Sequence, residues 1–391
     1  MQLQLGIDIF LTQSAAYANK RIALVTNDAA TTSKGLLSRA AMQQQGFHIS
    51  KLFSPEHGIS RTGDDGVAQY NSIDGITGLP IISLYGEKLA PSAADLMDID
   101  IVVFDIPDAG CRFYTYLWTM TYVMEACAQY RIPFLILDRP NPIGANIAKA
   151  EGPFLDELHC TSFIGRWNIP LKHSCTLGEL AQYFSSTKVK GLSLTVIQCN
   201  NYHRQYTAVK DFAFVPTSPA LQNIASAMLY PGLGLLEAVN INEGRGTAMP
   251  FTICGAPFIN ANTLLQHWLL KNIAGIQTTA ISYTPQSSVY AGQLCHGLQF
   301  TITNASVLQP VAMGIALLQT LLQLYPQQIT EKPYPTAANP TGAAHLDKLL
   351  GIPHAFALLQ AGQPISTIVN PLWRNTISNY LLYLEAPASS Q

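Results

Sequence analysis

The first 200 residues alternate short runs of β-branched and aliphatic residues with segments of helical periodicity, and this alternation constrains the fold most strongly. It is typical of βαβ units, in which a helix joins two parallel strands by a right-handed crossover. We expect strands over 21–27, 49–54, 80–84, 101–105, 134–138 and 192–199. We expect helices over 36–45, near Ala93, over 119–130 and over 177–184. The sequence therefore predicts an α/β fold with a Rossmann-like parallel sheet.

A change in composition near residue 250 marks the expected end of this domain. Of the 46 charged side chains, 39 precede that position, and a Thr-rich strand over 299–303 and an apolar helix over 311–325 follow it. A chain of 391 residues also suits two cores better than one. We predict a Rossmann-like catalytic domain over residues 1–250 and a smaller α+β auxiliary domain over residues 251–391 that closes the cleft. The segment 327–342 reads as a surface connection.

Composition excludes several classes of partner. The net charge is −2 and only 12% of residues are charged, so no basic field exists to hold nucleic acid. Seven cysteines, with no two separated by two residues, fit neither a disulfide framework nor a zinc finger, and we expect no metal. The N-terminus lacks the basic and apolar regions of a signal peptide. We expect a cytoplasmic protein without a membrane segment, or a periplasmic or secreted one if a signal peptide was removed.

Several common catalytic motifs are missing. The chain has no Gly-x-Gly-x-x-Gly after its first strand, no Gly-Lys-Ser/Thr phosphate loop, no His-Glu-x-x-His and no Gly-x-Ser-x-Gly. The sequence therefore does not favour a nucleotide-binding protein, a zinc protease or a serine hydrolase of the commonest type. We expect no cofactor, and the sequence makes no prediction of oligomeric state.

Polar side chains follow five of the predicted strands at their carboxyl ends. They are Asn27, Asp28, Glu56, His57, Tyr85, Asp105, Asp108, Asp138, Arg139 and Asn141. In a parallel sheet these ends share one edge, where ligands bind. The sequence therefore predicts a ligand site along this rim.

Glu56 is the strongest candidate for proton transfer. Pro55 and Gly58 flank it and favour a tight turn that would fix its carboxyl group in one orientation, as a proton donor requires. A helix cap or a loop salt bridge is the structural alternative. His57 could orient Glu56 or donate to a substrate.

The stretch 105–116 joins two carboxylates, a guanidinium and three aromatic rings in a dozen positions. Arg112 could grip a carboxylate through two parallel N–H bonds, while Tyr114 or Tyr116 could stack on a sugar face. Internal pairing of Arg112 with Asp105 or Asp108 is the alternative.

Three further polar runs carry candidates. Two prolines stiffen the loop 138–142, which holds Asp138, Arg139 and Asn141. Thr176 and Glu179 form a capping-box pattern, so Glu179 is a helix cap rather than a catalyst, while the nearby His173 could face the cleft. The run 237–247 adds Glu243 and Arg245 among glycines that let backbone approach a ligand, or form an exposed turn.

These runs resemble a bacterial family formerly classed as a domain of unknown function and now associated with NamZ-type exo-β-N-acetylmuramidases. The resemblance covers nearly the whole chain and rests on residues 6–8, 25–27, 54–58, 104–116, 137–142, 151–153, 176–181, 243–247, 250–251 and 255–257. Pro107, Cys111, Lys172–Ser174 and Ser218–Ala220 depart from the family pattern, beside rather than on the candidate catalytic residues. These departures bear on substrate range more than on reaction type.

The resemblance implies an exo-acting glycoside hydrolase that releases N-acetylmuramic acid from the non-reducing end of peptidoglycan fragments such as MurNAc-GlcNAc. Glycosidic cleavage needs an acid and a second group, which can be the substrate's own acetamido oxygen. We predict Glu56 as the acid, with Asp105 or Glu243 as the second carboxylate. The predicted substrate-binding residues are Asn27, His57, Asp108, Arg112, Tyr114, Tyr116, Asp138, Arg139, Asn141, His173 and Arg245. A non-catalytic amino-sugar or muropeptide binding protein is the alternative.

Overall fold

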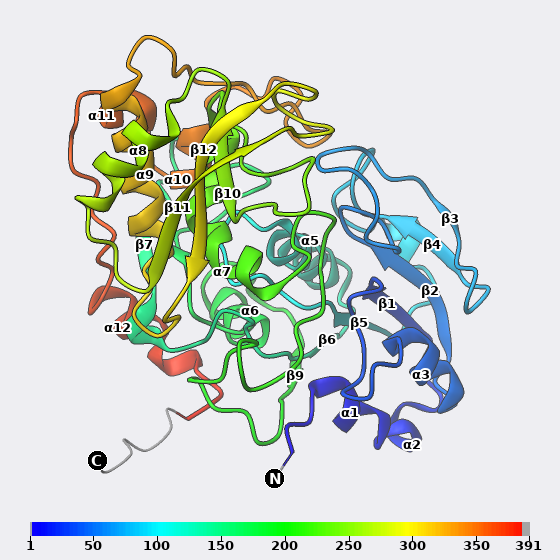
Figure 1. Cartoon of the computed structure of the whole chain (residues 1–391). Helices are drawn as coiled ribbons and strands as arrows, with labels where there is room; N and C mark the ends of the chain where they lie inside the picture. The colour runs from blue at the N-terminus through cyan, green and yellow to red at the C-terminus, as the bar shows by residue number, and fades with distance from the viewer. Residues whose placement is uncertain (1, 385–391) are drawn as a thin grey trace.

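The computed structural model describes residues 2–384, and its first domain is built on a seven-stranded sheet (Figure 1). The strand order is β3-β4-β2-β1-β5-β6-β9, and all neighbours are parallel except β3 and β4. The strands are β1 (Ile22–Thr26), β2 (Ile49–Ser54), β3 (Ser72–Ile73), β4 (Pro80–Ser83), β5 (Ile101–Asp105), β6 (Phe134–Leu137) and β9 (Leu194–Ile197). The six strands predicted for this sheet are confirmed, and the short edge strand β3 is additional.

Helices cover both faces of the sheet, as the unbroken apolar runs of its central strands require. In β1, Ala23 and Val25 pack into one core with α5 (Thr115–Tyr130) and α6 (Leu177–Thr187). Their neighbours Ile22 and Leu24 pack into a second core with α1 (Gly6–Leu11) and α3 (Ser38–Gln44). β5 and β6 alternate in the same way. The α/β fold is therefore confirmed.

The chain changes direction across this sheet between β1 and β5. From β1 it moves outward to β2 and β4, and then returns to place β5 on the other side of β1. The helix that follows β1 lies in one core and the helix that follows β5 lies in the other. The loops after these two strands thus diverge, which leaves a crevice at the carboxyl edge of the sheet.

The smaller second domain, counted here from the start of α7 rather than from the expected residue 251, contains a three-stranded antiparallel sheet in the order β10-β12-β11 (Figure 1). Its strands are β10 (Ile253–Ala256), β11 (Ile276–Tyr283) and β12 (Cys295–Ile302), and its longer helices are α7 (Ile224–Leu233), α8 (Ala261–Leu269) and α9 (Pro310–Leu324). A Cβ on Gly314 would meet the carbonyl oxygen of Gly232 at 2.4 Å. Glycine therefore lets α7 and α9 touch backbone to backbone.

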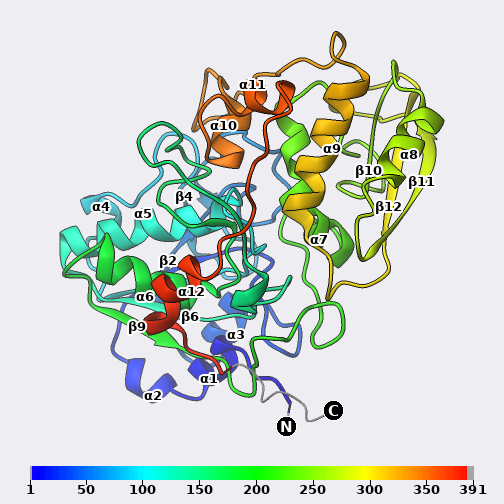
Figure 2. The same ribbon diagram turned by 90° about the vertical axis from the view of Figure 1, so that its left-hand side faces the viewer.

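Shorter elements complete the chain. They are α2 (Ser14–Tyr17), α4 (Ala93–Leu96), η1 (Ile147–Lys149), β7 (Glu151–Phe154), β8 (Pro170–Lys172), η2 (Gly234–Ala238), α10 (His345–Leu350), α11 (Ala355–Gln360), α12 (Leu372–Ile377) and η3 (Ser378–Tyr380). After α11 the chain returns to the first domain (Figure 2). There the Trp373 indole donates to the His173 carbonyl at 2.8 Å, and the Tyr383 hydroxyl donates to Asp138 at 2.6 Å. Within residues 2–384, no helix is both long and apolar enough to cross a membrane.

Candidate active site

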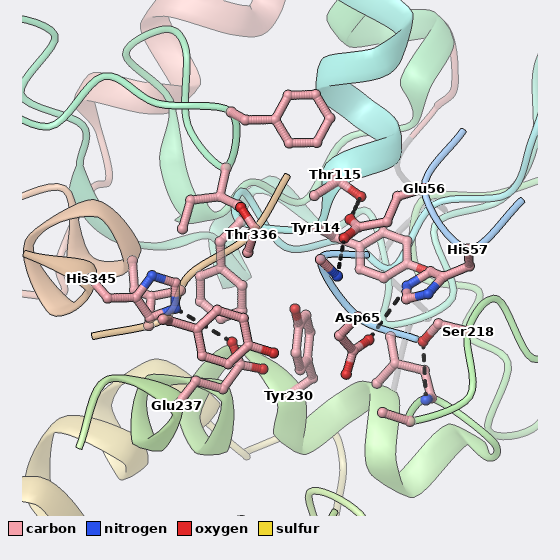
Figure 3. A pocket seen from close by; sticks show the side chains of 18 of the residues that line it. Glu56, His57, Asp65, Tyr114, Thr115, Ser218, Tyr230, Glu237, Thr336 and His345 are labelled. Atoms are coloured by element: carbon pink, nitrogen blue, oxygen red, sulfur yellow. Dashed lines mark hydrogen bonds and ion pairs between the residues drawn. The ribbon is translucent and has the colours of Figure 1, made fainter. Parts of the chain in front are cut away.

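A pocket lined by both domains lies where β2 and β4 end (Figure 3). We call it the Glu56 pocket. The first domain contributes Glu56, His57, Asp65, Tyr85, Tyr114 and Thr115. The chain from α7 onward contributes Tyr230, Glu237, Arg245, Tyr334, Thr336 and His345. Three carboxylates thus line one small space together with several aromatic rings.

Glu56 is held from two sides. Its Oε1 accepts a hydrogen bond from the Gly66 amide at 2.7 Å, and its Oε2 accepts one from the Thr115 hydroxyl at 2.7 Å. Thr115 is the first residue of α5, so the Glu56 carboxylate contacts a rigid element as well as its own loop. Burial raises the pKa of the adjacent Tyr85, whose hydroxyl therefore stays protonated at neutral pH. The carboxyl group is fixed in orientation at the edge of the pocket.

His57 stabilises the loop that carries Gly66. Its Nδ1 lies 2.8 Å from the Gly63 carbonyl oxygen, and because a carbonyl only accepts, Nδ1 carries the proton. Its Nε2 lies 3.6 Å from Asp65 Oδ1. His57 therefore faces Asp65 rather than Glu56 as a polar partner (Figure 3).

Arg245 joins carboxylates from both domains. Its Nε lies 2.6 Å from Asp65 Oδ2, and its Nη1 lies 2.8 Å from Glu237 and 2.7 Å from Glu243. Burial opposes ionisation of Glu237, but Arg245 and His345 outweigh it and lower the pKa of that carboxyl group. For Glu243 burial dominates over Arg245 and raises the pKa. One guanidinium thus holds two glutamates whose pKa values are pushed apart.

Sequence reasoning did not single out several residues of the pocket. Asp65 lies in a loop without periodicity, and His345 begins a helix that was not predicted. Tyr334 and Thr336 fall in the segment 327–342, which is largely exposed as expected of a surface connection and also lines the pocket. The Tyr334 and His345 rings stack 4.7 Å apart. Among these residues, only Glu237 could have been found from the sequence, because it begins the polar run 237–247 that contains Glu243.

A second group of predicted residues lies away from Glu56, at the ends of β5 and β6. Arg139 binds both oxygens of Asp105, at 2.6 and 3.0 Å, and Asp108 lies 3.1 Å from His173 Nε2. Asp108 and Arg139 line a separate cleft. The predicted rim exists, but its polar residues are divided between two cavities.

Arg112 has a structural position. Its side chain is fully buried, and it donates from Nη1 to the carbonyls of Pro153 and Ile169 and from Nη2 to that of Leu349, at 2.8 to 2.9 Å. It lines no part of the Glu56 pocket. The expected grip on a substrate carboxylate therefore has no support in the geometry, and neither expected internal partner, Asp105 nor Asp108, is the one used.

Four other predicted substrate-binding residues are buried among internal partners. Asp138 accepts from the Thr176 hydroxyl, the Gly178 amide and the Tyr383 hydroxyl. The remaining contacts are Asn141 Nδ2 to the Cys175 carbonyl, the Tyr116 hydroxyl to the Thr217 carbonyl, and the Ala29 amide to Asn27 Oδ1. These side chains fix the loops of the rim rather than face the Glu56 pocket. The capping box of Thr176 and Glu179 is confirmed.

No group of three or more His, Cys, Asp or Glu side chains within residues 2–384 is placed to hold a metal ion. A parallel-sheet domain, a smaller domain and a carboxylate-lined pocket between them define a two-domain α/β protein with the polar groups that glycosidic cleavage needs.

Comparison with known proteins gives the family. Residues 22–225 match the model of the N-terminal part of exo-β-N-acetylmuramidase NamZ, and residues 228–383 match the model of its C-terminal part. The chain belongs to the NamZ family. It is 36% identical to the peptidoglycan β-N-acetylmuramidase NamZ of Bacillus subtilis (strain 168), over 98% of this chain and 92% of that protein.

Two crystal structures of DUF1343 family proteins from Bacteroides fragilis NCTC 9343 share the fold. One has a TM-score of 0.86 and 26% identity, over 98% of this chain and 99% of its own. The other has a TM-score of 0.73 and 28% identity, over 98% and 100%.

Proposed function

We propose that this chain is an exo-acting β-N-acetylmuramidase that releases N-acetylmuramic acid from the non-reducing end of peptidoglycan fragments such as MurNAc-GlcNAc, with Glu56 as the general acid. One observation carries the residue assignment: among the glutamates of residues 2–384, only Glu56 both accepts two hydrogen bonds at the rim of the parallel sheet and lines a pocket shared by both domains. The matching NamZ relative, aligned over most of its length, supports the reaction.

The hydrogen bonds of Glu56 are compatible with proton transfer. Each carboxyl oxygen has two lone pairs, and the Gly66 amide and the Thr115 hydroxyl each use one. The remaining site on either oxygen can hold the proton that passes to the glycosidic oxygen as the bond from C1 to that oxygen breaks. Water then supplies the hydroxyl group at C1, and its proton returns to the carboxylate.

For the second group we propose Asp65 in place of Asp105 and Glu243. Arg139 occupies both oxygens of Asp105, which does not line the pocket. Glu243 forms an ion pair with Arg245 and does not line the pocket either. Asp65 does line it, next to the glycine that holds Glu56. Its carboxylate would orient the acetamido group as nucleophile or activate water on the opposite face of the sugar.

Stereochemistry distinguishes these two roles of Asp65. If the anomer released first, followed by NMR, keeps the β configuration, Asp65 orients the acetamido group. Inversion assigns it to water activation. Unchanged turnover in Asp65→Asn would remove it from both roles.

The substitution Glu56→Gln tests the acid. It preserves size and one acceptor, so the fold should persist while turnover of a chromogenic β-N-acetylmuramide falls roughly 10²-fold or more, the usual scale of general acid catalysis. Glu87→Gln is the matched control, because Glu87 is exposed and lies outside the pocket. Near-normal turnover in Glu56→Gln would exclude Glu56, and tight binding of the sugar without any turnover by the unaltered chain would make it a binding protein.

We propose a reducing compartment, the cytoplasm, as the place of action. All seven cysteines are free and buried, and disulfides are rare where thiols are kept reduced. Cell fractionation with an antibody to the chain checks this assignment, which a periplasmic or extracellular location would refute.

A further inference from the structure

A second cleft opens at the point where the strand order reverses. Loops after three neighbouring strands line it: Thr31–Ser33 after β1, Asp108 after β5 and Arg139 after β6. The segment 206–215 forms its outer wall. Its volume is about 570 Å³, within the range of small-molecule sites. We call it the switch-point cleft.

The position of this cleft is the place where open parallel sheets bind ligands. Between β1 and β5 the loops diverge, and the resulting crevice is the ligand site of the fold class. The Glu56 pocket lies to one side of it, beyond β2 and β4. The proposed chemistry therefore leaves the fold's own ligand crevice unassigned.

Asp108 provides a fixed acceptor in the cleft. Its side chain is only 4% exposed. Both of its hydrogen bonds fall on Oδ2, one from the Gly110 amide at 3.0 Å and one from His173 Nε2 at 3.1 Å. His173 Nδ1 accepts from the Cys175 amide, so Nε2 carries the proton. Oδ1 has no partner among the described residues, which is unfavourable for a buried carboxylate unless a ligand donates to it.

Arg139 provides a fixed donor beside it. The side chain is 8% exposed, and Nε and Nη2 are bound by Asp105 and Ser38. None of these bonds uses Nη1. Bidentate pairing holds the guanidinium plane still, so this N–H group points in a set direction.

The lining favours a neutral hydroxyl-bearing ligand. Arg139 and Lys210 are offset by Asp108 and Asp211, so the cleft gives a polyanion no net attraction. Fixed acceptors, fixed donors and an aromatic ring such as Tyr206 match the hydroxyl groups and the apolar face of a sugar.

We propose that the switch-point cleft binds a second saccharide, an amino sugar of the kind found in peptidoglycan. The choice of sugar rests on the proposed function, whereas the site itself does not. The two cavities lie close together, because Val215 lines this cleft and Ser218 lines the Glu56 pocket. These two residues are three positions apart in the chain, so they are separated by at most about 11 Å. The saccharide is therefore either the rest of the glycan held at Glu56 or a separate sugar.

The test measures binding in the full chain carrying Glu56→Gln. Ser33 lines the cleft with an exposed side chain, and Ser33→Trp fills this space while keeping the backbone hydrogen bond of Ser33 to Asp8. Ser193→Trp, at a position that is also exposed but lies outside both cavities, is the control. Saturation-transfer difference NMR with N-acetylglucosamine and with MurNAc-GlcNAc should show binding weakened about tenfold or more by Ser33→Trp alone. Should that variant fail to fold, Lys210→Ala is measured instead.

Binding of both sugars equal to that of the control overturns the proposal, whatever the role of Glu56. With Glu56 intact, the source of the saccharide follows from kinetics. A raised KM for MurNAc-GlcNAc with an unchanged KM for a chromogenic muramide shows that the cleft holds the rest of the glycan. Lost binding with both KM values unchanged shows a separate sugar site. Failure of Glu56→Gln to lower turnover would refute the assigned acid without touching this measurement.

Discussion

Replacing Arg112 should damage stability rather than substrate recognition. Burial lowers the pKa of Arg112 to about 10, so it remains charged at neutral pH and its three bonds to carbonyls are charge-assisted. In Arg112→Met the side-chain length persists but three buried carbonyls lose their donor, each worth about 1 to 3 kcal/mol. Removal of a buried charge offsets part of this loss. We expect a net loss of about 3 to 5 kcal/mol in the free energy of unfolding.

Urea denaturation followed by tryptophan fluorescence measures this loss, because the Trp118 indole donates to the Arg112 carbonyl. Lys190→Met, at an exposed position, should stay within about 0.5 kcal/mol of the unaltered chain. Per folded molecule, kcat and KM should be unchanged in Arg112→Met, since the residue does not line the Glu56 pocket. An unchanged denaturation midpoint together with a raised KM would refute this reasoning and restore Arg112 as a substrate ligand.

Three further predictions follow from the contacts of single side chains. Thr115→Val removes the hydroxyl that donates to Glu56 Oε2, and kcat should fall about tenfold with little change in KM, while Thr115→Ser retains activity. Of the three predicted substrate-binding arginines, Arg112, Arg139 and Arg245, only Arg245 lines the Glu56 pocket, where it could bind the lactyl carboxylate of muramic acid. Three carboxylates already offset its charge. Arg245→Lys should therefore lower the preference for muramic over glucosamine substrates only about tenfold, and an unaltered preference would exclude it. Burial raises the pKa of Asp138 from 3.8 to about 6, so the folded chain holds this proton more tightly than the unfolded chain, and stability falls as the pH rises from 4 to 6. Asp138→Asn removes that dependence, so the loss in free energy of unfolding that it causes should be smaller at pH 7 than at pH 4 by up to about 3 kcal/mol. An equal loss at both pH values would contradict the raised pKa.

The parallel sheet could be predicted because its central strands are buried on both faces and read as continuous apolar runs. Glu56 followed from the same logic, since the end of β2 and a tight turn fix its place. The role of Arg112 could not be predicted, because its partners are backbone carbonyls up to 237 positions away that carry no sequence signal. The sequence also could not predict that the polar residues of the rim are divided between two cavities. The segment 206–221 has no periodicity, and its path depends on contacts such as the hydrogen bond from the Tyr116 hydroxyl to the Thr217 carbonyl.

The smaller domain takes part in fixing Glu56. The Gly66 amide holds Glu56, and the Gly66 carbonyl accepts a hydrogen bond of 2.7 Å from the Ala337 amide, which belongs to the segment between α9 and α10. Asp65, which directly precedes Gly66, forms an ion pair with Arg245, which follows α7 in the chain. Both contacts act on the loop that orients the carboxyl group, so the geometry of Glu56 depends on chain that lies outside the parallel sheet. The parallel sheet alone would leave Glu56 on an unsupported loop, so the orientation of its carboxyl group needs both parts of the chain.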